Sequence, residues 1–246
     1  MDKFYWQLAK VISVVQETPR VKTITLQLPD WIPHLPGQHY DIRLTAEDGY
    51  QAQRSYSIAS PQEQTGQIDL TIEFIEEGEV SAYLHEGIAP GDSLEVRGPI
   101  GGYFVWTDNM KNLPLLLVAG GSGVVPLMAI LRHRAQIQAT NPTALLFSVR
   151  TGEDVIYHKE LMQLASQDPY INLALTFTRQ APSGWTGYQR RIDQAMLTDV
   201  IRRFTIYPQC YICGPTLLVE QVANTLVDMG LPPEIIRTER FGPTGA

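Results

Sequence analysis

The chain has 246 residues, 44% hydrophobic and 18% charged, a balance that supports one large or two ordinary folded domains. Its formal net charge of −7 argues against a nucleic-acid partner, because phosphate binding requires clustered lysine and arginine. Residues 1–6 lack the start of a signal sequence, and the apolar run 113–119 is too short to span a bilayer. We therefore expect a cytoplasmic protein that does not enter a membrane.

Residues 1–108 are predicted to form an antiparallel β-barrel or a sandwich. Short runs rich in β-branched residues recur there, and turn signals such as Leu35-Pro36-Gly37 and Arg97-Gly98-Pro99 separate them. One short helix is expected over 80–86. The expected strands are 10–16, 21–28, 40–44, 68–75 and 93–96.

Residues 113–246 are predicted to form an α/β domain with a doubly wound parallel sheet. Continuous apolar runs alternate there with helical patterns, which is typical of strands buried on both faces. The expected strands are 113–119, 144–149, 171–178 and 210–213, and the expected helices are 124–138, 158–166, 193–202 and 216–229. The boundary between the two domains is expected within 107–112.

The segment Arg54-Ser55-Tyr56-Ser57 combines a fixed cation, an aromatic ring and two hydroxyls. A guanidinium can hold a phosphate through paired donors, and a ring can lie against a flat heterocycle. In a strand Arg54 and Tyr56 share one face, and Ser55 and Ser57 share the other. Considered alone, the segment fits a polar edge strand better than a binding site.

The segment Gly120-Gly121-Ser122-Gly123 joins the first buried strand of the second domain to a helix. Glycines let backbone N–H groups approach a ligand closely, and a helix N-terminus favours a pyrophosphate. Its place at the carboxyl end of a strand is where open α/β sheets bind ligands. The alternative is an ordinary tight turn between strand and helix.

The two cysteines, Cys210 and Cys213, have a C-x-x-C spacing. Because they lie on one predicted strand at i and i+3, they point to opposite faces and can hardly share a metal. The five histidines also lack a metal-binding spacing, so no metal site is predicted. Cys213 precedes Gly214-Pro215 at the carboxyl edge of the sheet, where it is either a small core residue or part of a cofactor site.

These segments together resemble the ferredoxin–NADP reductase family, and the resemblance covers nearly the whole chain. Five short motifs stand in the family's order and at its spacing. They are Arg54-Ser55-Tyr56-Ser57 for R-x-Y-S, Glu79-Val80-Ser81 for the second flavin segment, Gly98-Pro99-Ile100-Gly101 for G-P-x-G, Gly120–Gly123 with Pro126 for G-G-x-G-x-x-P, and Cys213-Gly214-Pro215 for C-G-P.

The resemblance implies that the first domain binds FAD. Arg54 would bind the phosphates, Tyr56 would pack on the flavin or its ribityl chain, and Ser57 would hydrogen-bond near the flavin N5. Ser81 and the start of its helix would hold the pyrophosphate. The expected FAD-binding residues are Arg54, Ser55, Tyr56, Ser57, Val80 and Ser81.

The resemblance also implies that the second domain binds NADPH or NADH. The glycine-rich turn would hold the pyrophosphate, and Cys213 would line the nicotinamide pocket. Arginines after the second and third strands could hold a 2′-phosphate, which favours NADPH, although surface arginines are commonly solvated. The expected residues are Gly121, Ser122, Gly123, Ser148, Arg150, Arg179, Cys213, Gly214 and Pro215.

The end of the chain, Glu239-Arg240-Phe241, is similar to the terminal E-x-Tyr of plastid-type reductases. There the aromatic ring covers the flavin, so Phe241 would stack on it and Glu239 would give polar or proton assistance. Ser57, Cys213 and Glu239 are thus the expected catalytic residues. Five residues follow Phe241 and its ring lacks a hydroxyl, so packing at the domain junction is an equal alternative.

The implied activity is an FAD-dependent NAD(P)H oxidoreductase. Hydride passes to the flavin, and electrons then pass to a separate acceptor such as a ferredoxin or a flavodoxin. The chain itself lacks the four cysteines of an iron–sulfur domain. Two alternatives stay open: a reductase of free flavin or ferric iron, and an electron-transfer subunit that is active only with a catalytic partner.

Overall fold

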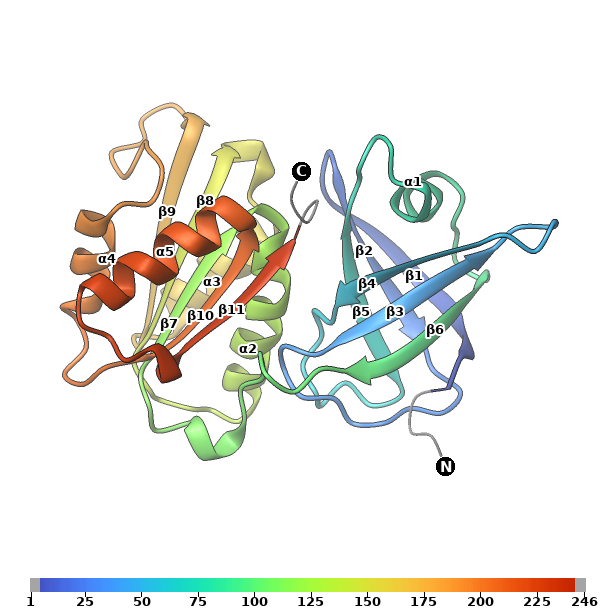
Figure 1. The fold of residues 1–246 in the computed structure, drawn as a ribbon, viewed down its shortest axis with the longest axis horizontal. Coiled ribbons are helices and arrows are strands. Elements are labelled where there is room, and N and C mark those ends of the chain that lie inside the picture. Colours follow the sequence, from blue (N-terminus) through green and yellow to red (C-terminus); the bar gives the residue numbers. More distant parts are fainter. Residues whose placement is uncertain (1–4, 242–246) are drawn as a thin grey trace. The chain divides into compact units, whose positions relative to one another are not determined.

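The computed structural model describes residues 5–241, which form two sheets, each the centre of one compact unit (Figure 1). The first unit runs up to Trp106 and includes Met128–Ile137, and the second comprises Thr107–Leu127 and the chain from Gln138 onward. The first change of unit is next to the boundary expected at 107–112. The assignment of 128–137 to the first unit had no signal in the sequence, and the two-domain boundaries stay a prediction.

The first unit is an antiparallel six-stranded sheet in the order β4-β3-β6-β1-β2-β5. Its two end strands meet through an isolated bridge between Ile58 and Leu70, which brings the sheet close to a closed barrel. The strands are β1 (Gln7–Thr18), β2 (Val21–Gln27), β3 (His39–Thr45), β4 (Gln51–Ser57), β5 (Gln67–Glu73) and β6 (Ser93–Ile100). Helix α1 (Glu79–Glu86) is the short helix that the sequence predicts.

The core of this sheet follows from strand alternation. Alternate residues over parts of β1, β2, β3 and β5 are apolar and buried, including Ile24, Leu26, Ile42, Leu70 and Ile72. Val80 and Leu84 of α1 join the same cluster one helical turn apart. The inward rows therefore fix which residues of β3 and β4 face outward.

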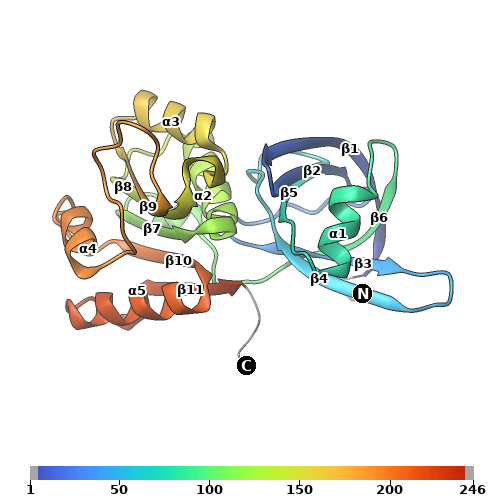
Figure 2. The ribbon, with the colours of Figure 1, turned by 90° about the horizontal axis from the view of Figure 1, so that it is seen from above.

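The second unit is a parallel five-stranded sheet in the order β11-β10-β7-β8-β9. Figure 2 shows α3 on one face and α4 and α5 on the other. The strands are β7 (Leu115–Gly120), β8 (Thr143–Thr151), β9 (Ile171–Gln180), β10 (Gln209–Pro215) and β11 (Ile236–Phe241), and the helices are α3 (His158–Gln167), α4 (Gln194–Ile201) and α5 (Thr216–Asp228). Helix α2 (Val124–Gln136) follows β7, and its residues from Met128 onward belong to the first unit. The predicted fold class, an antiparallel barrel followed by an α/β parallel sheet, is confirmed.

Two local features differ from the predicted elements. Helix α4 begins one residue late because Asp193 is its N-cap, and the Asp193 side chain accepts a hydrogen bond from the Met196 N–H at 2.9 Å. Strand β11 was not among the predicted strands. It lies at the edge of the sheet, paired only with β10, and its residues are mostly half-buried, so the sequence shows no continuous apolar run there.

Candidate functional site

Arg54 projects from β4 as an exposed guanidinium. Its guanidinium donates to the carbonyl of the preceding residue, Gln53, at 2.7 Å, and no carboxylate among residues 5–241 pairs with it. Its charge reaches the hydroxyls of both Tyr50 and Tyr56, where it opposes a rise in pKa that has other causes. Arg54 is therefore an exposed cation whose charge acts on two tyrosines, and its role in binding an anion stays a prediction.

Tyr56 and Ser57 end the same strand. Tyr56 is half-buried against the barrel core, and this burial raises its pKa to about 12. Ser57 is buried, opposite His39 in the ladder, and its hydroxyl has no hydrogen-bond partner within the described part of the chain. Because the hydroxyl oxygen is not fully enclosed by protein, it is open to solvent or to a ligand.

Ser55 does not lie with Arg54 and Tyr56. Its hydroxyl donates to Oδ1 of Asp41 on β3 at 2.6 Å, on the other face of β4. The hydroxyl that the sequence suggested for a cofactor is therefore occupied by a buried carboxylate. The sequence does contain the partner, an acidic residue fourteen positions upstream of Ser55. Only the strand register shows that this residue, Asp41, lies opposite Ser55.

The start of α1 offers backbone donors. No side chain caps this helix, so the N–H groups of its first turn have no partner from a cap. Ser81 lies in that turn, but its hydroxyl bonds the Ile75 N–H at 3.2 Å and the Gly78 carbonyl at 3.1 Å. Val80 and Ser81 can therefore offer their N–H groups to a pyrophosphate, whereas the Ser81 hydroxyl holds the preceding loop.

A cavity of about 550 Å³ opens beside Tyr50, and no motif in the sequence indicates it. Tyr50 and Tyr83 flank it, and Leu44, Ala52 and Leu94 supply apolar walls. The Tyr50 hydroxyl donates to Glu79 at 3.0 Å, which fixes the ring. The volume lies within the range of about 300–1,000 Å³ that is common for small-molecule sites.

The glycine-rich turn connects β7 to α2 through a short 3-10 turn over Gly121–Gly123. Gly121 has a φ of +54°, and a Cβ added there would meet nothing within 4 Å, so the space above the turn is open. At Gly123 an added Cβ would lie 2.1 Å from the Cys213 carbonyl oxygen. One glycine therefore leaves room for a ligand, and the other permits the close contact with β10.

Cys213 and Glu239 are directly opposite in the β10–β11 ladder. Burial raises the pKa of Glu239 to about 7, and its buried Oε2 has no hydrogen-bond partner among the described residues. Burial, and then the charge of Glu239, raises the pKa of the Cys213 thiol. Both cysteines are buried free thiols; Cys210 faces the core under α4 and α5, and Cys213 does not belong to that cluster.

The remaining predicted residues of the second unit lie along the carboxyl edge of its sheet. Ser148 is buried and opposite Gly120, whereas Arg150 and Arg179 are exposed near the ends of β8 and β9. Phe241 is half-buried and paired with Pro215, next to Gly214. Arg190, a further exposed arginine after β9, is paired with Asp193 at 2.6 Å.

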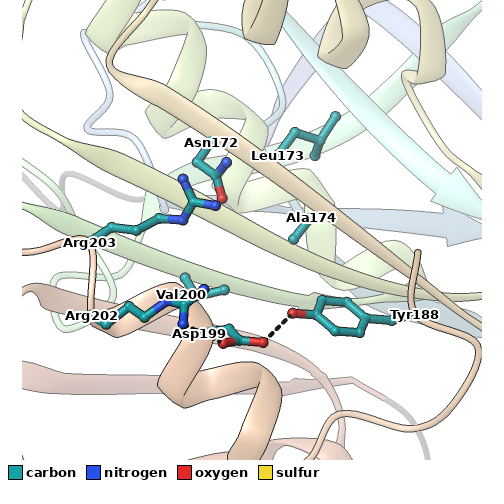
Figure 3. A pocket seen from close by; sticks show the side chains of 8 residues that line it. All are labelled: Asn172, Leu173, Ala174, Tyr188, Asp199, Val200, Arg202 and Arg203. Carbon is teal, nitrogen blue, oxygen red and sulfur yellow. Dashed lines mark hydrogen bonds and ion pairs between the residues drawn. The ribbon is translucent and has the colours of Figure 1, made fainter. Parts of the chain in front are cut away.

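A second pocket, of about 180 Å³, lies at the opposite edge of the same sheet (Figure 3). It is lined by Asn172–Ala174 at the amino end of β9 and by the end of α4. Within this pocket the Tyr188 hydroxyl donates a hydrogen bond to the Asp199 carboxylate at 3.0 Å. It is remote from the carboxyl edge where cofactors bind in such sheets.

Residues 5–241 contain neither a cluster of metal-binding side chains nor a membrane-spanning helix. No three His, Cys, Asp or Glu side chains there gather in a way that could hold a metal ion. No helix in that part of the chain is long and apolar enough to cross a membrane. The cytoplasmic location stays a prediction.

Comparison with known proteins gives matches to both units. Residues 8–105 match the oxidoreductase FAD-binding domain model, and residues 117–224 match the oxidoreductase NAD-binding domain model. Ferredoxin–NADP reductase B of Sorangium cellulosum is 31% identical over 241 residues, which cover 95% of this chain and 96% of that protein.

Two further comparisons limit what can be transferred. The glycine betaine monooxygenase reductase subunit of Chromohalobacter salexigens is 31% identical, but the chain spans only 64% of its length. The structure of a Neisseria gonorrhoeae ferredoxin NADP+ reductase with bound FAD and NADP superposes with a TM-score of 0.80 at 22% identity, covering 96% of this chain and 98% of that one. The structural likeness concerns the fold alone.

Proposed function

The chain belongs to the ferredoxin–NADP reductase-like family of FAD- and NAD(P)-binding oxidoreductases, and we propose that it passes electrons from NAD(P)H through FAD to a separate acceptor protein. It is an NAD(P)H-dependent flavin oxidoreductase with FAD and a nicotinamide dinucleotide as cofactors. The observation that carries the proposal is Arg54, an exposed cation on β4 without a carboxylate partner in the described chain, whose charge acts on Tyr50, just before the strand, and on Tyr56.

The residues of β4 and α1 fit FAD. Bound flavin supplies the ability to accept a hydride and to release electrons singly or in pairs. Arg54 and the N–H groups of Val80 and Ser81 would hold the pyrophosphate. Tyr56 would pack on the flavin, and the unpartnered Ser57 hydroxyl would hydrogen-bond near N5.

The cavity beside Tyr50 fits the adenosine end of FAD. Successive residues of a strand are about 3.4 Å apart, so Ala52 lies about 7 Å before Arg54, and Ser57 lies about 10 Å beyond it. Along β4 the cavity residue Ala52 therefore comes first, the phosphate ligand Arg54 second and the flavin contact Ser57 last. Arg43 at the cavity rim is bound in a bidentate pair to Glu95, so the rim suits an uncharged ring better than a phosphate.

The second unit fits the nicotinamide dinucleotide. The open turn at Gly121–Gly123 would take the pyrophosphate, with Ser122 between the glycines. Ser148, Arg150 and Arg179 would contact the adenosine end and favour NADPH. These residues share the carboxyl edge of the sheet with Cys213.

Cys213, Gly214 and Pro215 would line the nicotinamide pocket. Glu239 would hold a proton on Oε2 near neutral pH, because its pKa is about 7. Phe241 would cover a flat ring, since it ends β11 next to Pro215. Their catalytic use is part of the proposal.

We assign the acceptor by its chemistry, as a small one- or two-electron carrier protein such as a ferredoxin or a flavodoxin. The support is the relatives' names, which include a ferredoxin–NADP reductase, a glycine betaine monooxygenase reductase subunit and a phenol hydroxylase P5 protein. The monooxygenase subunit is longer than this chain, which spans 64% of it. The acceptor therefore remains a proposal for experiment.

The test begins with the purified protein and its absorption spectrum. We expect bound or added FAD to bleach when NADPH is added without oxygen, faster than with NADH. Reduction of ferredoxin, flavodoxin, free FMN and ferric citrate is then compared. A preparation that neither binds FAD nor bleaches contradicts the cofactor assignment, and brisk reduction of free flavin alone contradicts the protein acceptor.

A further inference from the structure

Asp41 is a buried carboxylate on β3, the strand next to the one that carries Arg54. It lies on β3 with 4% of the residue exposed, and it accepts hydrogen bonds from three side chains. Ser55 donates to Oδ1 at 2.6 Å, and Gln53 and Arg97 donate to Oδ2 at 3.0 and 2.7 Å. Charge-assisted hydrogen bonds of this kind are about twice as strong as neutral ones.

The geometry joins three strands at one point. Asp41 is opposite Ser55 in the β3–β4 ladder and opposite Arg97 in the β3–β6 ladder. The Arg97 guanidinium also lies 4.8 Å from the centre of the Trp6 ring, which Arg43 approaches at 4.2 Å. Arg97 thus contacts the Trp6 ring as well as Asp41, and these two contacts hold its guanidinium beside the carboxylate.

Gln53 and Ser55 are the two neighbours of Arg54 in the chain. Because side chains alternate across a strand, both point away from the face on which Arg54 lies. Asp41 therefore holds the residue before and the residue after Arg54 while leaving Arg54 itself free. β4 needs such support, since it ends the strand order and pairs along its length with β3 only.

We propose that Asp41 is a positioning residue that fixes the backbone at Arg54 through Gln53 and Ser55 and so orients the guanidinium toward the FAD pyrophosphate. The inference rests on the proposed role of Arg54. Ser55, which the motif suggested as a cofactor contact, acts here from the opposite face of the strand.

The sign of the effect separates positioning from direct electrostatics. A carboxylate close to a bound pyrophosphate repels it, so removing its charge would strengthen FAD binding if charge alone mattered. Positioning predicts the reverse, because Asp41→Asn weakens the links to Arg97 and to β4. Arg97 pairs with Asp41, which already offsets much of its field.

The decisive experiment is a double-mutant cycle, read by titrating the apoprotein with FAD and following flavin fluorescence. Gln53→Ala combined with Ser55→Ala should raise the FAD dissociation constant about tenfold, as is common for residues that share a hydrogen-bond network. In an Arg54→Ala background the same pair should have no further effect. A general loss of structure would instead weaken FAD equally in both backgrounds, which would overturn the proposal.

The matched control is Thr25→Ala, which removes a comparable hydroxyl–carboxylate bond, Thr25 to Asp69 at 2.8 Å, between β2 and β5, together with the bond that Thr25 accepts from Ser13 at 3.0 Å. We expect it to lower Tm as Ser55→Ala does, by about 2–4 °C, and to leave the FAD dissociation constant unchanged. If Arg54→Ala itself leaves FAD binding intact, the role of Arg54 is wrong. If Arg54→Ala weakens FAD but the Gln53 and Ser55 changes do not, or if Asp41→Asn strengthens it, the positioning role of Asp41 is wrong.

Discussion

The two candidate cofactor regions present their binding groups in different ways. Around β4 and α1 the groups are side chains, an exposed Arg54 and the half-buried Tyr56, standing on a strand at the end of its sheet. Around β7 and β10 the chain offers mainly backbone, and its reactive side chains, Cys213 and Glu239, are buried or half-buried. Cofactor binding by the first region should therefore depend on side-chain charge more than on backbone packing. Cofactor binding by the second region should depend on backbone packing more than on side-chain charge.

Gly123→Ala is the harshest way to test this contrast. The added Cβ would lie 2.1 Å from the Cys213 carbonyl oxygen, so the turn and β10 must separate. We expect the free energy of unfolding to fall by about 3 kcal/mol, at the upper end for overpacking, together with loss of NADP+ binding. Chemical denaturation and calorimetric titration measure both. Gly102→Ala, which meets nothing within 4 Å, is the control and should change neither.

Glu239→Gln tests the buried acid through pH. The pKa of Glu239 is raised from 4.5 to about 7, so folding favours its protonated form. Its contribution to stability is fully present below pH 4.5 and is lost as the pH rises through 7, by up to about 3 kcal/mol. The glutamine variant should lose this dependence, which Tm measured from pH 5 to pH 8 will show. Parallel curves for both proteins would contradict the assignment.

Arg54→Ala and Ser57→Ala should separate binding from reduction in the first region. Removing a charged hydrogen-bond donor typically costs about 2 kcal/mol, so Arg54→Ala should weaken FAD roughly thirtyfold. Ser57→Ala should slow flavin reduction by NADPH more than it weakens FAD, as stopped-flow absorbance can show. Arg20→Ala, on an arginine already paired with Glu76, is the control. If both variants lost only FAD affinity, the placement of Ser57 near N5 would be wrong.

Tyr50→Ala is the mildest change and tests the cavity. Loss of one aromatic contact should weaken FAD about tenfold, at the upper end for ring stacking, while FMN, which lacks adenosine, should bind as before. Tyr207→Ala is a matched control, since both rings belong to residues that are 56% exposed. Equal weakening of FMN and FAD would show that the cavity does not hold the adenosine end.

Much of the fold could be predicted because the period of the apolar residues differs between the two halves. Alternation placed the barrel strands, and buried runs such as 144–149 placed the parallel ones, within a few residues of β8 and its neighbours. β11 escaped because it is an edge strand without an apolar run. Short patterns cannot show such strands, whose place depends on the partner β10.

The candidate site was predictable only as far as residue types and local order allow. Arg54 and Gly121 are open to a ligand, as their motifs suggested. The hydroxyls of Ser55 and Ser81 are instead bound by Asp41 and by the loop at Ile75–Gly78. A motif identifies a hydroxyl, but tertiary neighbours decide which group receives its hydrogen bond.

The two buried thiols of β10 can be used to measure local unfolding of the second unit. Cys210 and Cys213 are both 0% exposed, and burial raises the pKa of Cys210 to about 12. Only the thiolate reacts with alkylating reagents, so neither sulfur should be labelled while the strand stays paired. The labelling rate of the unmodified protein therefore measures how often β10 separates from its neighbours β11 and β7, and it should fall when a dinucleotide binds there.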